Sequence, residues 1–215
     1  MNLYTYFTNS HKELYEKYFL ESFNKYLLSD FNLITTHTAQ KTENGDFTDP
    51  EFGACTDDKL IILKQALKDN EGKWFIYADC DIQFFDNIKK DIEGYLSDDI
   101  DMVCQEDTNT ICTGFLIIKS SQRMRDFIDL VANNRYKHHD DQMTMNYFSN
   151  QIRFKFLDRD KYYTIGNYNG GRVWNGEDFN THSGILMHHA NFTIGVKSKI
   201  NLLEKVRENI GYNNI

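Results

Sequence analysis

Short apolar runs alternate along this chain with longer segments in which apolar residues recur every three or four positions. The short runs are typical of buried strands and the longer spacing is typical of helices. The strand-like runs cover residues 3–7, 32–36, 74–78, 101–104 and 115–119, and the helical patterns cover 11–28, 57–69, 121–133, 141–150 and about 197–207. Alternation of this kind predicts an α/β fold with a mostly parallel central sheet and helices on both faces.

The apolar positions of the first two helical segments indicate which residues fill the core. We expect the core to include Tyr15, Phe19, Phe23 and Leu27 from the first, and Ile61, Leu63 and Leu67 from the second. Two polar or glycine-rich segments, 38–49 and 162–180, are predicted to be long loops.

Length and charge narrow the class of protein. A chain of 215 residues with 40% hydrophobic content fits a single domain with one sizeable core. A net charge of −8 disfavours nucleic acid and anionic lipid as partners. The sequence has no secretory signal and no apolar stretch of membrane-spanning length, so we expect a soluble, cytoplasmic chain, of the cell or of a host cell, without membrane insertion. A monomer is the favoured state.

The four cysteines do not indicate a metal or disulfide framework. They lack Cys-x-x-Cys spacing and lie mostly in apolar segments, as small core residues do in reducing compartments. They are Cys55, Cys80, Cys104 and Cys112.

The strand-like run 74–78 ends directly at two carboxylates, Asp79 and Asp81. In open α/β sheets ligands collect at the carboxyl ends of strands, where alternate carboxylates can bind one divalent cation. The Asp-x-Asp spacing occurs twice more, and both further copies lie in polar segments that we expect to form solvated turns. These copies are Asp99/Asp101 and Asp158/Asp160.

Four further segments carry residues that could bind a ligand or take part in catalysis, although each segment has a structural explanation when taken alone. A glycine, Gly114, is expected at the mouth of a strand, where backbone can approach a ligand. Either Asp140 or Asp141 is a suitable N-cap for the helix that contains Gln142 and Asn146. The remaining segments hold His188, His189 and Asn191, followed by Gly195, Lys197 and Lys199 at a helix start suited to phosphate.

Together these segments resemble the metal-dependent GT-A nucleotide-sugar glycosyltransferases, and more faintly the glycosyltransferase modules encoded by large DNA viruses. The matching motifs, in the family's order, are Phe75-Ile-Tyr-Ala-Asp-Cys-Asp81, Thr113-Gly114-Phe115, Asp141-Gln142-x-x-x-Asn146 and His189-x-Asn191-Phe-x-x-Gly195-x-x-x-Lys199. One departure is Cys112, which stands where the family usually has Asn, so that a contact to sugar or acceptor is missing or is made by Thr113 instead.

The resemblance implies roles for individual residues. Asp79, Asp81 and His189, with His188 as the alternative, would hold Mn²⁺ or Mg²⁺ against the donor diphosphate. The other residues implied to contact the donor are Thr8, Asn9, Lys59, Gly114, Lys197 and Lys199, with Phe7 beside them and Asp79 near the ribose; for Lys59 an ordinary surface lysine is the alternative. Gln142 would face the anomeric carbon, and Asp140 or Asp141 would be the general base if the enzyme inverted.

The implied activity is transfer of a hexose or deoxyhexose from a UDP-sugar to the hydroxyl of a glycan acceptor, with retention. Residues 1–110 would form the nucleotide-binding half, and residues 111–215 the half that binds sugar and acceptor and completes the metal site. Two alternatives remain at this point. One is a phosphatase of the haloacid-dehalogenase type, which also uses Asp-x-Asp after a strand, and the other is a catalytically degenerate module that binds nucleotide or glycan.

Overall fold

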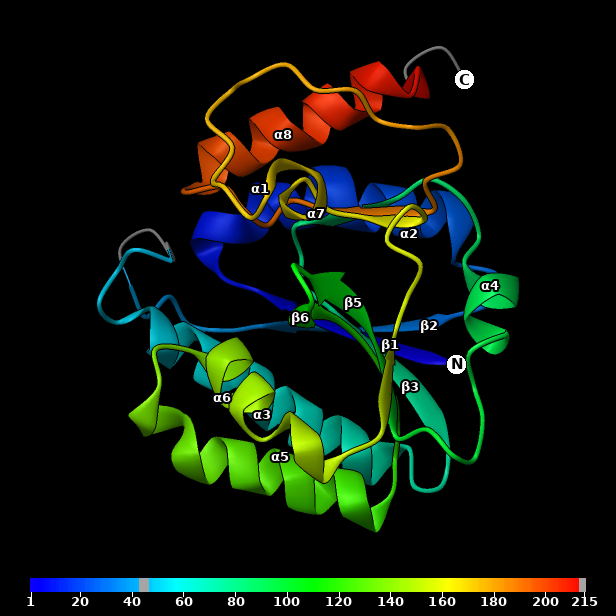
Figure 1. Cartoon of the computed structure of the whole chain (residues 1–215), viewed down its shortest axis with the longest axis vertical. Coiled ribbons are helices and arrows are strands. Elements are labelled where there is room, and N and C mark those ends of the chain that lie inside the picture. The colour runs from blue at the N-terminus through cyan, green and yellow to red at the C-terminus, as the bar shows by residue number, and fades with distance from the viewer. Residues whose placement is uncertain (43–46, 213–215) are drawn as a thin grey trace.

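The computed structural model of the chain describes residues 1–42 and 47–212. Its centre is a six-stranded sheet with the order β2-β1-β3-β6-β5-β7 (Figure 1). The strands are β1 (Asn2–Phe7), β2 (Asn32–His37), β3 (Trp74–Ala78), β5 (Met102–Asp107), β6 (Thr110–Lys119) and β7 (Phe154–Phe156). Neighbouring strands pair in parallel except at β6, which is antiparallel to both β3 and β5. The predicted mostly parallel sheet is confirmed.

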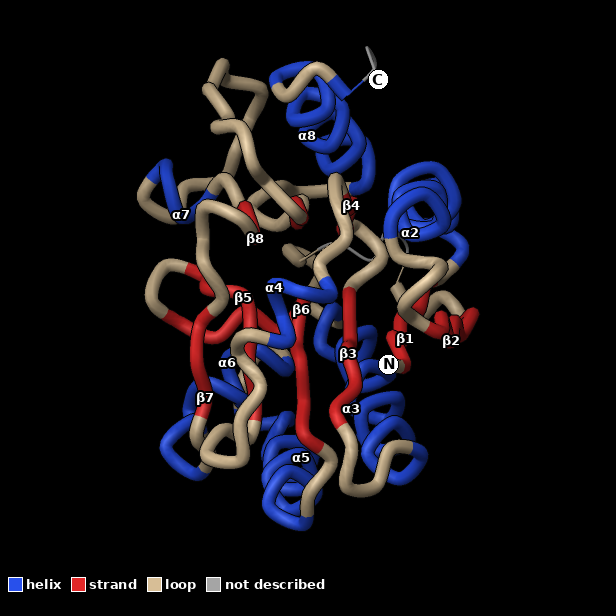
Figure 2. Tube along the Cα trace, turned by 90° about the vertical axis from the view of Figure 1, so that its right-hand side faces the viewer, coloured by secondary structure: helices blue, strands red, loops and turns tan. Residues whose placement is uncertain are grey.

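Helices cover both faces of this sheet (Figures 1 and 2). One face packs against α3 (Phe52–Asp69), α5 (Gln122–Asn134) and α6 (Asp141–Tyr147). The other face packs against a helical segment near the N-terminus that changes type along its length: η1 (Asn9–His11), α1 (Lys12–Leu14), η2 (Tyr15–Leu20) and α2 (Glu21–Tyr26). Helix α8 (Val196–Asn209) packs outside that segment. The shorter helices are α4 (Lys89–Glu93), η3 (Arg135–Lys137), η4 (Ser149–Gln151) and α7 (Gly166–Asn169).

The two-residue period of β3 explains the two cores. Ile76 and Ala78 belong to the core under the N-terminal helices, and Phe75 and Tyr77 belong to the core under α3 and α5. The expected core positions of the first helix are buried, and so are Leu63 and Leu67 of the second. The prediction for Ile61 was wrong, because Ile61 is 65% exposed. A residue two positions before Leu63 lies about 200° away around a helix, on the solvent side.

A second, three-stranded sheet lies between the central sheet and α8 (Figure 2). It consists of β4 (Ile82–Phe84), β8 (Tyr162–Tyr163) and β9 (Met187–His189), in the order β4-β9-β8. The sequence did not reveal this sheet, and the predicted loop 162–180 contains β8 and α7, because strands of two or three residues are too short to show a period. In its register Ile82 lies opposite His189. The residue directly after Asp81 is therefore paired with the candidate histidine.

The second Asp-x-Asp copy is not the solvated turn that we expected. Asp99 is exposed, but Asp101 is only 4% exposed. The Asp101 carboxylate accepts hydrogen bonds from Arg123 and Arg153 at about 3 Å. A charged residue in a polar stretch can be buried where cations from other segments meet it, and these arginines lie 22 and 52 residues away. Asp158 and Asp160 are exposed, as expected.

The cysteines are free thiols, and Cys80, Cys104 and Cys112 are buried while Cys55 is partly buried. This agrees with their expected place in or near the core. Within residues 1–42 and 47–212, no helix combines the length and the apolar character needed to cross a bilayer.

Candidate active site

The antiparallel direction of β6 determines which residues meet at one edge of the sheet. Because β6 runs against its neighbours, its first half lies beside the carboxyl ends of β3 and β5. The backbone N–H of Asp79 donates to the carbonyl oxygen of Gly114 at 2.7 Å. Gly114 thus lies inside β6, which begins four residues earlier, and not at the mouth of a strand as expected. Ligands bind at this edge in open α/β folds.

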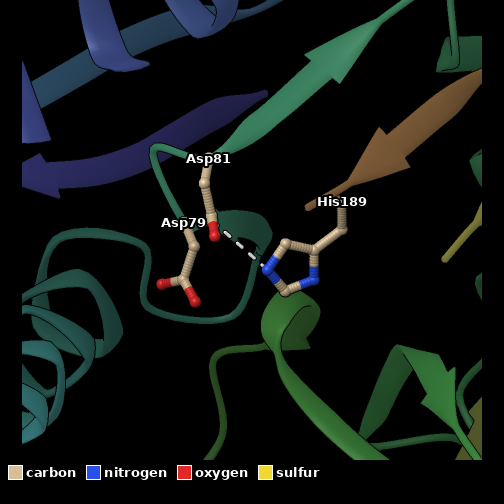
Figure 3. A group of neighbouring side chains, drawn as sticks. All are labelled: Asp79, Asp81 and His189. Atoms are coloured by element: carbon tan, nitrogen blue, oxygen red, sulfur yellow. Dashed lines mark ion pairs between the residues drawn. The ribbon is translucent and has the colours of Figure 1, made fainter. Parts of the chain in front are cut away.

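Asp79, Asp81 and His189 come together at this edge (Figure 3). Each offers one ligand atom, and these atoms all lie within 4.8 Å of one another. Asp79 and Asp81 leave β3 together, and His189 arrives on β9 through the pairing with β4. Two carboxylates and one imidazole are ligands that Mn²⁺ and Mg²⁺ accept, so the residues present fit a divalent cation.

Lys59 is a buried cation and not the surface lysine that the sequence left open. Its ammonium lies 3.1 Å from a carboxylate oxygen of Asp79 and 3.4 Å from one of Asp141. Burial lowers the pKa of Lys59, but Asp141 and Asp79 outweigh that effect and hold the pKa well above its usual value. Lys59 also lies inside α3 and does not open the helix, because α3 begins at Phe52 instead of near residue 57. The other oxygen of Asp79 accepts from the Tyr77 hydroxyl at 2.5 Å.

Asp81 is balanced by two further cations. Its carboxylate lies 2.5 Å from the Lys199 ammonium and 3.3 Å from Nε2 of His189. Burial by itself raises the pKa of the Asp81 carboxyl, but Lys199 and His189 hold it well below its usual range. Burial likewise lowers the pKa of His189, and the carboxylate of Asp81 outweighs it and raises this pKa to about 10. Asp81, Lys199 and His189 are therefore three charged groups in contact with one another at the end of β3.

Gly114 makes room for the imidazole of His189. A Cβ atom on Gly114 would lie 2.2 Å from Cε1 of that ring, far inside van der Waals contact. The glycine is therefore required by the histidine, and its importance does not depend on a ligand approaching the backbone. The neighbouring His188 is fully buried and faces Gln83, and burial lowers its pKa to about 3. Of the two histidines, His189 is the one that lies at the carboxylates.

The start of α6 supplies the second half of the site. Asp140 is the N-cap and accepts from the backbone N–H of Met143 at 2.7 Å. Asp141 is buried, and burial raises its pKa. The Gln142 side chain accepts from the backbone N–H of Thr113 at 3.1 Å and donates to Asp107 at 2.8 Å. These bonds fix the amide of Gln142 beside the carboxylate of Asp107.

Two adjoining cavities open onto this cluster, with volumes of about 140 and 420 Å³. Lys59, Asp79, Asp81 and Lys199 line both of them. The smaller cavity extends toward the end of β1 and is also lined by Tyr6, Phe7, Thr8, His11, Cys55, Gly195 and Val196. The larger extends toward α6 and is also lined by Asp107, Cys112, Gly114, Asp140, Asp141, Gln142, His189 and Asn191. The charged cluster is the wall that the two cavities share.

Two of the predicted donor-binding residues, both within the described part of the chain, line neither cavity. Asn9 is exposed and pairs with His37 at 2.9 Å. Lys197 is exposed, whereas Lys199, two residues later and about 200° round the helix, points to Asp81. The geometry thus separates Lys199 from Lys197, which the sequence could not do.

Sequence reasoning missed Asp107 and Gln105. Asp107 ends β5 at the ligand-binding edge, and a longer estimate of that strand would have found it by the rule that located Asp79. Gln105 gives no such signal. It is fully buried and accepts a hydrogen bond from His189, and a neutral glutamine just beyond the predicted strand gives no indication of that contact.

Comparison with known sequences agrees with the motifs. A sequence profile of the nucleotide-diphospho-sugar transferase family matches residues 20–203. A UDP-galactose:fucoside alpha-3-galactosyltransferase of Dictyostelium discoideum is 31% identical over 116 residues, which is 50% of this chain. The aligned part is 18% of that relative's length. The chain therefore corresponds to a small part of a larger protein in that case.

Solved structures share the fold at low sequence identity. A glycosyltransferase involved in the glycosylation of the major capsid of PBCV-1 has a TM-score of 0.60 at 14% identity, covering 93% of this chain and 98% of that one. The galactosyltransferase LgtC, solved with donor and acceptor sugar analogues, has a TM-score of 0.58 at 11% identity, covering 88% of this chain and 86% of that one. GlyE of Streptococcus pneumoniae TIGR4 has a TM-score of 0.58 at 13% identity, covering 93% and 59%. These likenesses confirm the GT-A type of fold.

Proposed function

The chain belongs to the nucleotide-diphospho-sugar transferase family, and from that membership we propose that it moves a hexose or deoxyhexose from a UDP-sugar to the hydroxyl of a glycan acceptor. The reaction depends on a divalent cation and retains the anomeric configuration. Family membership contradicts the phosphatase alternative. A degenerate binding module is still a separate hypothesis, and the experiment below distinguishes it.

One observation carries the proposal. Asp79 and Asp81, with Lys59 and Lys199 beside them, line both cavities, and His189 joins the two carboxylates from the larger one. A nucleoside diphosphate sugar has the same sequence of parts: a flat base and ribose, a doubly charged linker, and a sugar. The small cavity at the end of β1 suits the nucleoside, the charged wall suits the diphosphate, and the larger cavity at α6 suits the sugar and the acceptor.

The chain's own residues would act on the donor as follows. Phe7 and Thr8 contact the base and ribose, and Asp79 also contacts the ribose. Asp79, Asp81 and His189 hold Mn²⁺ or Mg²⁺, which supplies Lewis-acid stabilisation of the charge that develops on the leaving diphosphate. Lys199 adds a hydrogen-bonded cation on the same side.

This assignment follows the two halves of the domain predicted from the sequence, with one exception. Residues 1–110 bind the nucleoside, and residues 111–215 bind the sugar and acceptor and complete the metal site. Lys199 and Gly195 of the second half also line the nucleoside cavity. The C-terminal segment is therefore proposed to contact both parts of the donor.

Retention is favoured by what the candidate bases already do. Asp140 uses its carboxylate to cap α6, and Asp141 is buried against Lys59. An inverting enzyme needs a carboxylate free to take the acceptor's proton. In retention by front-side attack the departing phosphate takes that proton, and Gln142 lines the sugar cavity near the reacting centre.

The test is isothermal titration calorimetry of UDP, GDP and their hexose conjugates, with and without Mn²⁺, on wild type and Asp81→Ala. The matched control is Asp99→Ala, which changes an exposed Asp of the same Asp-x-Asp pattern. We expect Mn²⁺-dependent binding of UDP and its conjugates, lost in Asp81→Ala and kept in Asp99→Ala. Equal binding with and without Mn²⁺ would contradict the metal site.

Turnover separates the transferase from the degenerate module. With the bound UDP-sugar and a panel of glycan acceptors, a transferase releases UDP and a module that only binds does not. The proton coupling constant at the anomeric carbon of the product reads retention or inversion directly. A product of inverted configuration would contradict the retaining mechanism and would make Asp141 a candidate general base.

A further inference from the structure

Two adjacent histidines of β9 each contact a fully buried glutamine. Nδ1 of His189 lies 2.9 Å from Oε1 of Gln105, and Nδ1 of His188 lies 3.2 Å from Nε2 of Gln83. Both glutamines have no exposed surface. The two pairs look alike in composition, but the amides present opposite ends to the rings.

The orientation of Gln105 is fixed by the backbone. Its amide NH₂ donates to the carbonyl oxygens of Tyr162 at 3.1 Å and of Tyr163 at 3.2 Å. A flipped amide would set its oxygen against both carbonyl oxygens and leave two buried acceptors unpaired. Oε1 therefore faces His189 as an acceptor, and Nδ1 of His189 must carry a hydrogen.

The orientation of Gln83 is fixed in the opposite sense. Its Oε1 accepts from Nε of Arg207 at 2.8 Å, and its NH₂ donates to the carbonyl oxygen of Leu203 at 3.0 Å. The NH₂ group therefore also faces His188, whose Nδ1 must accept. His188 carries its hydrogen on Nε2, an atom that has no hydrogen-bond partner among the described residues.

A bulge in β6 lies beside the contact between Gln105 and His189. Cys104 pairs with Leu116, but Gln105 pairs with Cys112, so residues 113–115 of β6 have no partner in β5. Gln105 itself keeps the alternation of β5: Val103 faces the core that contains Tyr162 of β8, and Gln105, two residues on, donates to the Tyr162 carbonyl oxygen. Gly114, one of the bypassed residues, lies under the imidazole ring. The bulge thus holds the glycine that leaves space for the ring, and the regular alternation of β5 supplies the acceptor that orients it.

We infer that Gln105 is a positioning residue that accepts the Nδ1 hydrogen of His189, so that Nε2, on the side of Asp81, is the nitrogen that coordinates a divalent cation. The inference rests on the proposed metal-dependent function. A ligating histidine needs its other nitrogen protonated and held, and loss of such a partner typically weakens metal binding about 10- to 100-fold. The buried pair Gln83–His188 is built for the other tautomer and does not reach the carboxylates.

The test compares Gln105→Met with Gln83→Met by titrating Mn²⁺ alone and following free Mn²⁺ by electron paramagnetic resonance. Both changes remove a buried amide next to a histidine of β9, so any general damage to the fold is matched. We expect about 10- to 100-fold weaker Mn²⁺ binding in Gln105→Met and a change of less than about 2-fold in Gln83→Met. Equal weakening in the two variants, or no weakening in Gln105→Met, would overturn the inference.

A spectroscopic signature keeps the inference testable if a variant fails to fold. Nitrogen-15 spectra of the imidazoles of wild type in saturating Mg²⁺, assigned with His189→Gln, report which nitrogen carries the hydrogen. We expect Nδ1–H for His189 and Nε2–H for His188. Nε2–H on His189 would refute the role of Gln105 even if the protein binds metal. Failure of wild type to bind Mn²⁺ at all would instead overturn the proposed metal site on which the inference rests.

Discussion

The same Asp-x-Asp pattern lies at opposite edges of the central sheet, and the two copies end in different surroundings. Asp79 and Asp81 follow the carboxyl end of β3, whereas Asp99 and Asp101 precede the amino end of β5, which runs in the same direction. In each copy the second Asp is almost fully buried, at 6% and 4% exposed. Burial of a carboxylate therefore does not identify a functional site in this chain.

The cations that meet the two carboxylates make the difference. Asp101 is met by two guanidinium groups and the backbone N–H of Arg153, none of which loses its proton at ordinary pH. Asp81 is met by the imidazole of His189 and the ammonium of Lys199, and it faces two cavities. Asp101 is therefore enclosed by its partners and has a structural role, whereas Asp81 can exchange its partners for a ligand. Five measurements test this contrast.

Asp81→Asn should lower kcat/KM at least about 1,000-fold, because loss of a metal ligand removes several kcal/mol of transition-state stabilisation. The measurement is UDP release at saturating Mn²⁺. Asp99→Asn is the control and should keep full activity, since its side chain is exposed. Similar activity in both variants would mean that the first copy is no more functional than the second.

Asp141→Asn should lower kcat about 100-fold while donor binding changes by less than about 3-fold. Asp141 pairs with Lys59, lines the larger cavity and does not line the smaller one, which we propose for the nucleoside. Steady-state kinetics together with calorimetric donor affinity separate the two quantities. A loss of donor affinity as large as the loss of turnover would rule out this role.

Asp101→Asn should cost about 2 kcal/mol of stability and leave activity unchanged. The variant leaves two arginines without their anionic partner, and the cost is reduced because both guanidinium groups remain about half exposed to water. Urea unfolding gives the free energy, and the same preparation gives kcat/KM. A loss of activity in the folded variant would show that the two edges of the sheet are coupled.

Lys199→Met should weaken binding of UDP about 10-fold, since one charge-assisted hydrogen bond contributes about 1.5 kcal/mol. Lys197→Met is the control on the same helix and should change it by less than about 2-fold, because Lys197 is exposed and points elsewhere. Calorimetry with Mn²⁺ present measures both. The reverse order of effects would restore Lys197 as the diphosphate contact.

Acid should remove the contribution of Asp101 to stability in a defined range. The arginines hold the pKa of this carboxyl at about 2, against burial, which raises it. An unfolded Asp has a pKa of about 3.9, so the stabilisation is complete above about pH 5 and is lost as the pH falls toward 2. Between pH 5 and pH 3 wild type should lose about 1 kcal/mol more than Asp101→Asn. Parallel pH curves for the two proteins would contradict this.

Sequence reasoning predicted the central fold and named most of the residues that line the candidate site, because both depend on local signals. β3 matched its predicted bounds, since five apolar residues end abruptly at a carboxylate. The helices were found by their periodicity, although their ends shifted where caps gave no signal. α3, for example, begins five residues before its predicted start. The candidate residues Asp79, Asp81, Asp141, Gln142 and His189 line one continuous pair of cavities, so motif order was a good guide to proximity.

The wrong or missing predictions concern residues whose surroundings are formed by segments distant in the sequence. Lys59 and Asp101 appear in the sequence as charged residues on polar faces, and both are buried by partners from other parts of the chain. Gln105 was missed because its partner His189 lies 84 residues away, on another strand. Lys197 and Lys199 differ only in the direction in which they leave the same helix turn.

The amino-acid sequence by itself determined the alternation of strands and helices, the charge, and the residue types needed for a cation and a diphosphate, because periodicity and motif spacing are properties of neighbouring residues. The tertiary structure decided which of two identical Asp-x-Asp pairs faces a cavity, which of two adjacent histidines reaches it, and which nitrogen of that histidine is directed at Asp81. Those choices depend on strand register and on hydrogen bonds between residues up to 124 positions apart, and such distances leave no pattern in a local window.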